Sequence, residues 1–126
     1  MKSERQYTLA LKKLFENVSG VKFHQLPDTG MLTHRKPYDF YMIVNGKHIS
    51  VEAKIQNGEL QDHQGKALTE DADAKGKSYV LRYGVESMTF YAWINAKEIE
   101  LITTRFRLLK EEGEVLRLAQ ILAEGV

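Results

Sequence analysis

The sequence predicts an α/β domain in which helices flank a mixed β-sheet of about five strands. Apolar residues recur at helical spacing in three segments, residues 3–17, 60–75 and 108–123. Runs rich in β-branched and aromatic residues lie between them, at 21–26, 40–54, 78–83 and 89–94. The resulting order of helix, strand, hairpin, helix, strand, strand and helix is typical of a layered α/β architecture. A length of 126 residues fits one domain, so we expect residues 1–126 to fold as a single unit.

Composition excludes several classes of protein. With 43% hydrophobic and 28% charged residues, the chain is ordinary for a soluble globular protein. The absence of cysteine excludes disulfides and cysteine-ligated zinc and favours an intracellular protein. Because there is no apolar signal region and no run of about 18 apolar residues, we expect a cytoplasmic protein that neither is secreted nor spans a membrane. A net charge of +1 is low for a nucleic-acid-binding domain, so any such surface would have to be local.

The first helix has a clear start signal. Ser3 and Gln6 fit a capping box, in which each side chain accepts a hydrogen bond from the other residue's backbone N–H. One face of the helix is apolar, at Tyr7, Leu11, Leu14, Phe15 and Val18. Glu4 lies in the first turn, where the helix dipole favours a carboxylate, and this local role is enough to explain its presence.

The strongest local signal is a β-hairpin around Asn45-Gly46. Both residue types tolerate the positive φ that a type I′ turn requires, and apolar runs flank them on each side. Counting outward from a two-residue turn puts Asp39 opposite Glu52. Lys54 shares the face of Glu52 because side chains alternate along a strand. The register therefore predicts a cluster of two carboxylates and one ammonium group.

Two opposed carboxylates need a compensating charge, since like charges facing each other destabilise a sheet. A divalent cation would supply it, because paired carboxylates are hard oxygen ligands of the kind that hold Mg²⁺. The Lys54 ammonium could then orient an attacking water or stabilise developing negative charge, as metal-assisted phosphodiester hydrolysis requires. The alternative is a solvated hairpin face on which Lys54 simply pairs with Glu52 or Asp39.

The segment after the hairpin carries a further candidate. A helix over residues 60–75 would place Leu60, Gln64 and Leu68 four apart on one face. A glutamine on an inward face is unusual, and its local role could be to cap the helix or to satisfy a backbone group.

Farther along the chain, before the closing helix, residues 98–102 are expected to form only a short segment.

The closing helix is expected from residue 108 to 123, or from Glu114 if Gly113 interrupts it. Its apolar side is broad for a small domain, which hints at self-association.

Several basic residues are candidates for phosphate contacts. They are His34, Arg35, Lys36, Lys75, Lys77 and Arg82, with Arg105 and Arg107 as a further pair. The first three lie in a polar loop just before the acid-bearing strand, where a loop is well placed to touch a ligand. For any one of them the alternative is an ordinary solvated surface, and Arg82 could simply flank a strand end.

The residue pattern around the two acids resembles the motif of a known superfamily. Pro37-x-Asp39 followed by Glu52-Ala53-Lys54 at the end of the next strand is similar to the PD-(D/E)XK nucleases. Within that superfamily the chain looks most like the VRR-NUC group and the phage and bacterial Holliday-junction resolvases. There a segment resembling Gly58-Glu59-Leu60 to Gln64 opens the following helix. The resemblance covers about residues 4–83.

This resemblance implies a restriction-endonuclease-like fold and a Mg²⁺-dependent DNA endonuclease, with Mn²⁺ as the other candidate metal. It implies that Asp39, Glu52 and the backbone carbonyl of Ala53 hold the metal, with Glu4 as a third acid. Lys54 would act on the attacking water, and Gln64 would lie beside the metal pocket and orient the substrate. The implied setting is DNA recombination or repair in a bacterial or phage-infected cell, with branched DNA as substrate and a homodimer as the active form.

Two other functions are compatible with the residues. One is a catalytically inactive nucleic-acid-binding or assembly module of the same fold, although such a module has little need of an acid pair that repels phosphates. The other is a restriction enzyme, which would need a sequence-recognition region that so short a chain does not offer.

Overall fold

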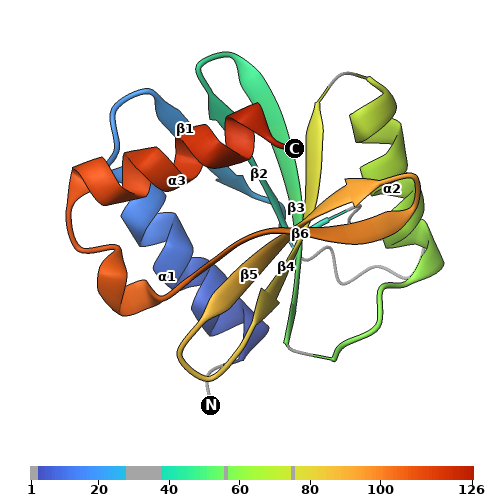
Figure 1. Cartoon of the computed structure of the whole chain (residues 1–126), viewed down its shortest axis with the longest axis horizontal. Coiled ribbons are helices and arrows are strands. Elements are labelled where there is room, and N and C mark those ends of the chain that lie inside the picture. The colour runs from blue at the N-terminus through green and yellow to red at the C-terminus, as the bar shows by residue number, and fades with distance from the viewer. Residues whose placement is uncertain (1–2, 28–37, 56, 75) are drawn as a thin grey trace.

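The computed structural model describes residues 3–27, 38–55, 57–74 and 76–126. Its centre is a six-stranded sheet with the strands in chain order, β1-β2-β3-β4-β5-β6 (Figure 1). The strands are β1 (Val21–Gln25), β2 (Phe40–Val44), β3 (Lys47–Ile55), β4 (Lys77–Tyr83), β5 (Met88–Ile94) and β6 (Lys97–Thr104). Strands β3 and β4 pair in parallel and every other neighbouring pair is antiparallel. The predicted mixed α/β fold is confirmed, with one strand more than expected.

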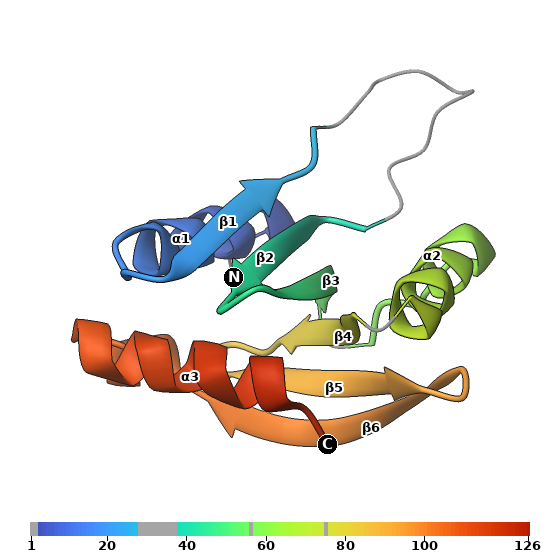
Figure 2. The ribbon, with the colours of Figure 1, turned by 90° about the horizontal axis from the view of Figure 1, so that it is seen from above.

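The helices divide between the two faces of the sheet. They are α1 (Glu4–Glu16), α2 (Asp62–Asp73) and α3 (Glu112–Glu124), with a 3₁₀ turn at Phe106–Leu108 before the last. Helices α1 and α3 share the larger hydrophobic core on one face, whereas Leu68 of α2 packs in a smaller cluster on the other. Figure 2 shows α1 and α3 at the opposite end of the view from α2. Each face of the central strands is therefore buried.

The hairpin prediction is confirmed in register. Five residue pairs run from Val44↔Lys47 to Phe40↔Val51. Asn45 and Gly46 have φ values of 50° and 79°, as a type I′ turn requires. The capping box of α1 is also present, with the Ser3 hydroxyl accepting from Gln6 N–H at 3.2 Å.

Three predicted boundaries are wrong. Helix α2 begins at Asp62 rather than residue 60, because the chain first makes a turn in which Gly58 N–H donates to the Ile55 carbonyl at 2.8 Å. The segment at 98–102 is part of a full strand, β6, that completes a second hairpin with β5. Helix α3 begins at Glu112, since residues 106–108 form a separate 3₁₀ turn, and Gly113 lies within its first turn.

The apolar side of α3 is used inside the domain. Its inward residues Val115, Leu118, Ala119 and Leu122 are all buried in the larger core. The Tyr79 hydroxyl of β4 also donates to the Leu122 carbonyl at 2.6 Å, which fastens the end of the helix to the sheet. Packing inside the domain is therefore enough to account for these apolar residues. No helix within the described ranges is long and apolar enough to cross a bilayer.

Candidate active site

The acid-bearing end of β3 lies in the middle of the sheet, between β2 and β4. Glu52 pairs with Val80 of β4, and its side chain is only 2% exposed. The alternation along β3 puts Glu52 on the face that α2 covers, together with Lys54, which is half-buried. Burial of a carboxylate is costly unless hydrogen bonds or charges compensate it. The surroundings of Glu52 must therefore supply such partners.

Gln64 of α2 supplies a hydrogen bond to that carboxylate. Its Nε2 donates to Glu52 Oε1 at 2.7 Å, and both residues are buried. Its Oε1 accepts from the backbone N–H of Gln61 at 2.9 Å, which satisfies one of the unpaired donors at the start of the helix. The capping role expected for Gln64 is therefore present, and the same amide contacts a predicted catalytic acid.

Asp39 is held at the same end of β3 by both its backbone and its side chain. Its N–H donates to the Val51 carbonyl at 3.1 Å, and its own carbonyl accepts from Leu26 N–H at 2.9 Å. The carboxylate Oδ2 accepts from the backbone N–H of Ala53 at 2.7 Å. The register between β2 and β3 ends at the pair Phe40↔Val51, one pair before the expected pairing of Asp39 with Glu52. The Asp39 carboxylate instead reaches the peptide that joins Glu52 to Ala53.

Glu4 approaches this end of the sheet from the other face. It lies one helical turn before Thr8, whose hydroxyl is 3.3 Å from the Tyr83 hydroxyl at the end of β4. Burial raises the pKa of the Tyr83 phenol, and the nearby carboxylates of Asp39 and Glu4 raise it further. Glu4, in the first turn of α1, and Asp39, just before β2, therefore both lie near the Tyr83 phenol.

The predicted basic residues fall in different places. Arg82 pairs with Lys54 in the β3–β4 register, and its guanidinium makes two hydrogen bonds to the Glu98 carboxylate, at 2.8 and 2.9 Å. Lys77 begins β4 and lies three residues before Val80, the β4 partner of Glu52, which is about 10 Å along a strand. It is therefore displaced from Glu52 toward the end of the strands away from Lys54. His34, Arg35, Lys36 and Lys75 lie outside the described residues.

A large surface hollow lies beside the acids rather than over them. It is an open groove of about 1040 Å³ that includes Asn57, Gly58 and Glu59 together with Arg82, Tyr83 and Glu98. Among the described residues, neither Glu52 nor Gln64 lines it. The groove therefore borders the Lys54 end of β3.

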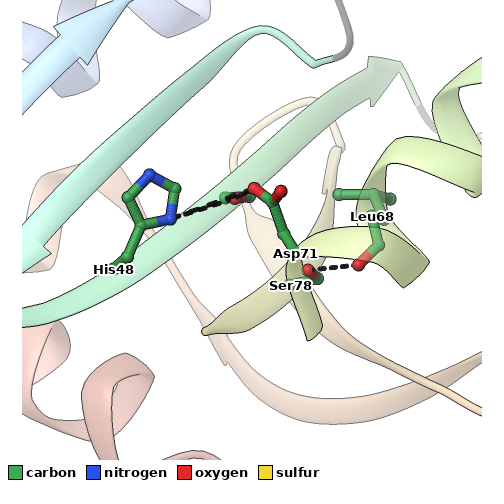
Figure 3. Close-up of polar contacts among 5 residues, drawn as sticks. His48, Leu68, Asp71 and Ser78 are labelled. Carbon is green, nitrogen blue, oxygen red and sulfur yellow. Dashed lines mark hydrogen bonds and ion pairs between the residues drawn. The ribbon is translucent and has the colours of Figure 1, made fainter. Parts of the chain in front are cut away.

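A second polar cluster was missed by sequence reasoning (Figure 3). Asp71 of α2 accepts a hydrogen bond from the Ser50 hydroxyl and lies 3.9 Å from His48 Nδ1. The Ser78 hydroxyl donates to the Leu68 carbonyl at 2.6 Å in the same region. The available signal was the alternation that puts His48, Ser50 and Glu52 on one face of β3. These contacts fasten the second half of α2 to the strands beneath it.

The donor set at the acid end is chemically suitable for a magnesium ion. Mg²⁺ is commonly held by one or two carboxylates, with waters and substrate phosphates completing its shell. Asp39 and Glu52 would supply two such carboxylates. Within the described ranges, no three or more His, Cys, Asp or Glu side chains are grouped closely enough to share a metal. A site built on these residues would therefore depend on two carboxylates, with backbone carbonyl and non-protein oxygens as the other ligands.

Comparisons with known proteins find similarity among solved structures. No family model matches the chain, and no curated protein sequence matches it. Among solved structures, the chain is similar to Hjc from Archaeoglobus fulgidus, a Holliday junction resolvase from an archaeal hyperthermophile. The alignment covers 94% of this chain and 97% of that one, with 16% sequence identity and a TM-score of 0.49.

Proposed function

We propose that this protein is a metal-dependent endonuclease that hydrolyses phosphodiester bonds in DNA. The observation that carries the proposal is the buried Gln64–Glu52 hydrogen bond of 2.7 Å at the end of β3. A solvated hairpin face, the alternative reading of these acids, does not fit a Glu52 that is 2% exposed. The fold maintains a desolvated carboxylate beside a second acid, and buried titratable groups placed together in this way are candidates for catalysis.

Asp39, Glu52 and the backbone carbonyl of Ala53 would hold the metal. Mg²⁺ is the expected ion and Mn²⁺ the other candidate. When bound, the ion would stabilise charge on the phosphoryl and leaving oxygens of the substrate. Gln64 keeps Glu52 in one orientation, because its amide is itself fixed by the Gln61 N–H.

Lys54 would provide the cationic group of the reaction. It lies two residues beyond Glu52 on the same face of β3, so its ammonium is on the acid side of the sheet. A positioned ammonium stabilises the negative charge that develops when water attacks phosphorus. Lys54 would also orient that water by hydrogen bonding.

Branched DNA is the proposed substrate class. This part of the proposal rests on the resemblance of the motif around Asp39, Glu52 and Lys54 to Holliday-junction resolvases. A homodimer is proposed on the same ground, since a four-way junction presents two equivalent strands for cleavage.

The test is cleavage of labelled four-way junction, flap and linear duplex DNA, with and without Mg²⁺ or Mn²⁺. Wild type is run beside Asp39→Ala, Glu52→Gln and Lys54→Ala, and beside Glu100→Gln, which changes an exposed acid on β6. We expect metal-dependent cutting by wild type and Glu100→Gln only, with paired nicks on the junction. Retained cutting by the Asp39→Ala protein would refute the proposed site. Binding of DNA without cleavage under any condition would favour the inactive binding module instead.

A further inference from the structure

The turn after β3 is held against Lys54 by the ion pair between Arg82 of β4 and Glu98 of β6. Gly58 lies against the aliphatic part of Lys54, since a Cβ atom built on Gly58 would be 3.4 Å from Lys54 Cδ and 3.5 Å from Lys54 Cβ. The same atom would be 3.3 Å from the Ile55 carbonyl oxygen. This spacing is tight for any side chain, so a glycine here allows the turn to approach the lysine closely.

Both ends of the Gly58 residue are anchored. Its N–H donates to the Ile55 carbonyl at 2.8 Å, which closes the turn. Its carbonyl accepts from Arg82 Nη1 at 2.6 Å. A hydrogen bond from a cationic donor is stronger than one from a neutral donor. The Arg82 contact therefore fixes the position of the turn relative to the sheet.

Arg82 is in turn oriented by Glu98 of β6. Nε and Nη2 donate to the two carboxylate oxygens at 2.8 and 2.9 Å, and the two side chains are 19% and 26% exposed. A planar, bidentate pair of this kind fixes the guanidinium plane, which a single bond to a lysine would not do. The remaining edge of the guanidinium, at Nη1, is thereby aimed at the Gly58 carbonyl.

We propose that Arg82 and Glu98 are positioning residues for Lys54, acting through Gly58, rather than contacts for substrate phosphate. In this arrangement Glu98 orients Arg82, Arg82 holds the Gly58 carbonyl, and Gly58 confines the Lys54 stem to the acid side of β3. The role of Lys54 in catalysis rests on the proposed nuclease function, but the confinement of its side chain does not.

The test uses Glu98→Gln, Arg82→Lys and Gly58→Ala, with Glu100→Gln as the control on the same strand. Glu98→Gln keeps the shape of the side chain but replaces one acceptor oxygen with a donor amide. Arg82→Lys keeps the positive charge but loses the bidentate geometry. Circular dichroism and thermal melting identify any variant that fails to fold. Two readouts are compared, kcat and KM on the DNA substrate that wild type cuts, and the side-chain signals of Lys54 in ¹³C-lysine-labelled protein, assigned with Lys54→Arg.

We expect all three variants to shift the Lys54 Cδ and Cε signals and to lower kcat by about ten- to a hundredfold at nearly unchanged KM, because small misplacements of a catalytic group have effects of this size. Glu100→Gln should leave both readouts as in wild type. A rise in KM with kcat retained in these variants would overturn the proposal in favour of a phosphate contact by Arg82. Unmoved Lys54 signals in folded Glu98→Gln and Gly58→Ala proteins would also overturn it. If wild type cuts no DNA, the nuclease function fails, but the Lys54 signals still decide whether the positioning exists.

Discussion

The Gln64 amide of α2 donates to the Glu52 carboxylate of β3 at 2.7 Å, while its oxygen accepts from the Gln61 N–H at 2.9 Å. These two bonds need opposite ends of one amide, so they fix its orientation. Rotating the amide by half a turn would place a donor against a donor and oxygen against a carboxylate. The start of α2 and the orientation of the central acid are therefore set together.

Gln64→Glu should destabilise the protein at neutral pH, by about 2–4 kcal/mol, because it places two carboxylates together in a buried site. The pair would hold a shared proton, which raises its pKa above that of an unfolded glutamate. Stability is then present below the unfolded pKa and is lost as pH rises through the raised folded value. Denaturant melts at pH 5 and pH 8 would show a deficit relative to wild type that is larger at pH 8.

The control for this prediction is Gln61→Glu. Gln61 is exposed and precedes α2, where the helix dipole favours a negative charge. Its stability should match wild type at both values of pH. A Gln64→Glu protein as stable as wild type at pH 8 would show that Glu52 and Gln64 are not in contact in solution.

Tyr79 and Tyr83 should resist ionisation until the protein unfolds. Burial raises the pKa of both phenols, and at Tyr83 the Asp39 and Glu4 carboxylates raise it further. Because the folded pKa lies above the unfolded value of 10.0, the stabilising effect is present below pH 10 and is lost as the pH rises beyond it. Ultraviolet titration of phenolate should show these two tyrosines ionising only with alkaline unfolding, and Tyr83→Phe should reduce the steepness of that unfolding.

Ala96→Gly should stabilise the hairpin between β5 and β6. Asn95 and Ala96 both have positive φ, at 53° and 58°, a conformation that costs an alanine about 1–2 kcal/mol. Part of that gain is offset by the greater flexibility of glycine in the unfolded chain, so we expect a net increase of about 0.5–1 kcal/mol in the free energy of unfolding.

Urea denaturation measures this change directly. The opposite substitution at the other hairpin, Gly46→Ala at φ 79°, should lower the stability. An Ala96→Gly protein less stable than wild type would show that the turn differs from the one described.

Asp71→Ala should loosen the second half of α2. It removes the acceptor of the buried Ser50 hydroxyl and the partner of His48, which should cost about 1–3 kcal/mol. Asp73→Ala, an exposed position on the same helix, is the matched control and should change stability little. Hydrogen exchange would locate the loosened segment. We expect the α2 amides to exchange faster in Asp71→Ala and at wild-type rates in Asp73→Ala.

The sequence by itself determined the hairpin and the capped first helix, since both depend on short-range chemistry. Asn45-Gly46 has the required positive φ in residues that tolerate it, and this sets the register from Val44 to Phe40. Ser3 and Gln6 form a capping box over three residues. The second hairpin carried no such signal, because its turn contains Ala96 instead of glycine, and β6 was therefore not recognised as a strand.

Only the tertiary structure decided which side chains meet across elements. Sequence alternation put Glu52 and Lys54 on one face, but it could not show that the start of α2 lies over Glu52 or that Asp39 would bind the Ala53 amide. The sequence made Arg82 a candidate phosphate contact but could not show its partner Glu98, which is 16 residues away on a strand that was not predicted. Such contacts depend on how strands and helices are placed relative to one another, and that placement is fixed by packing of the whole core.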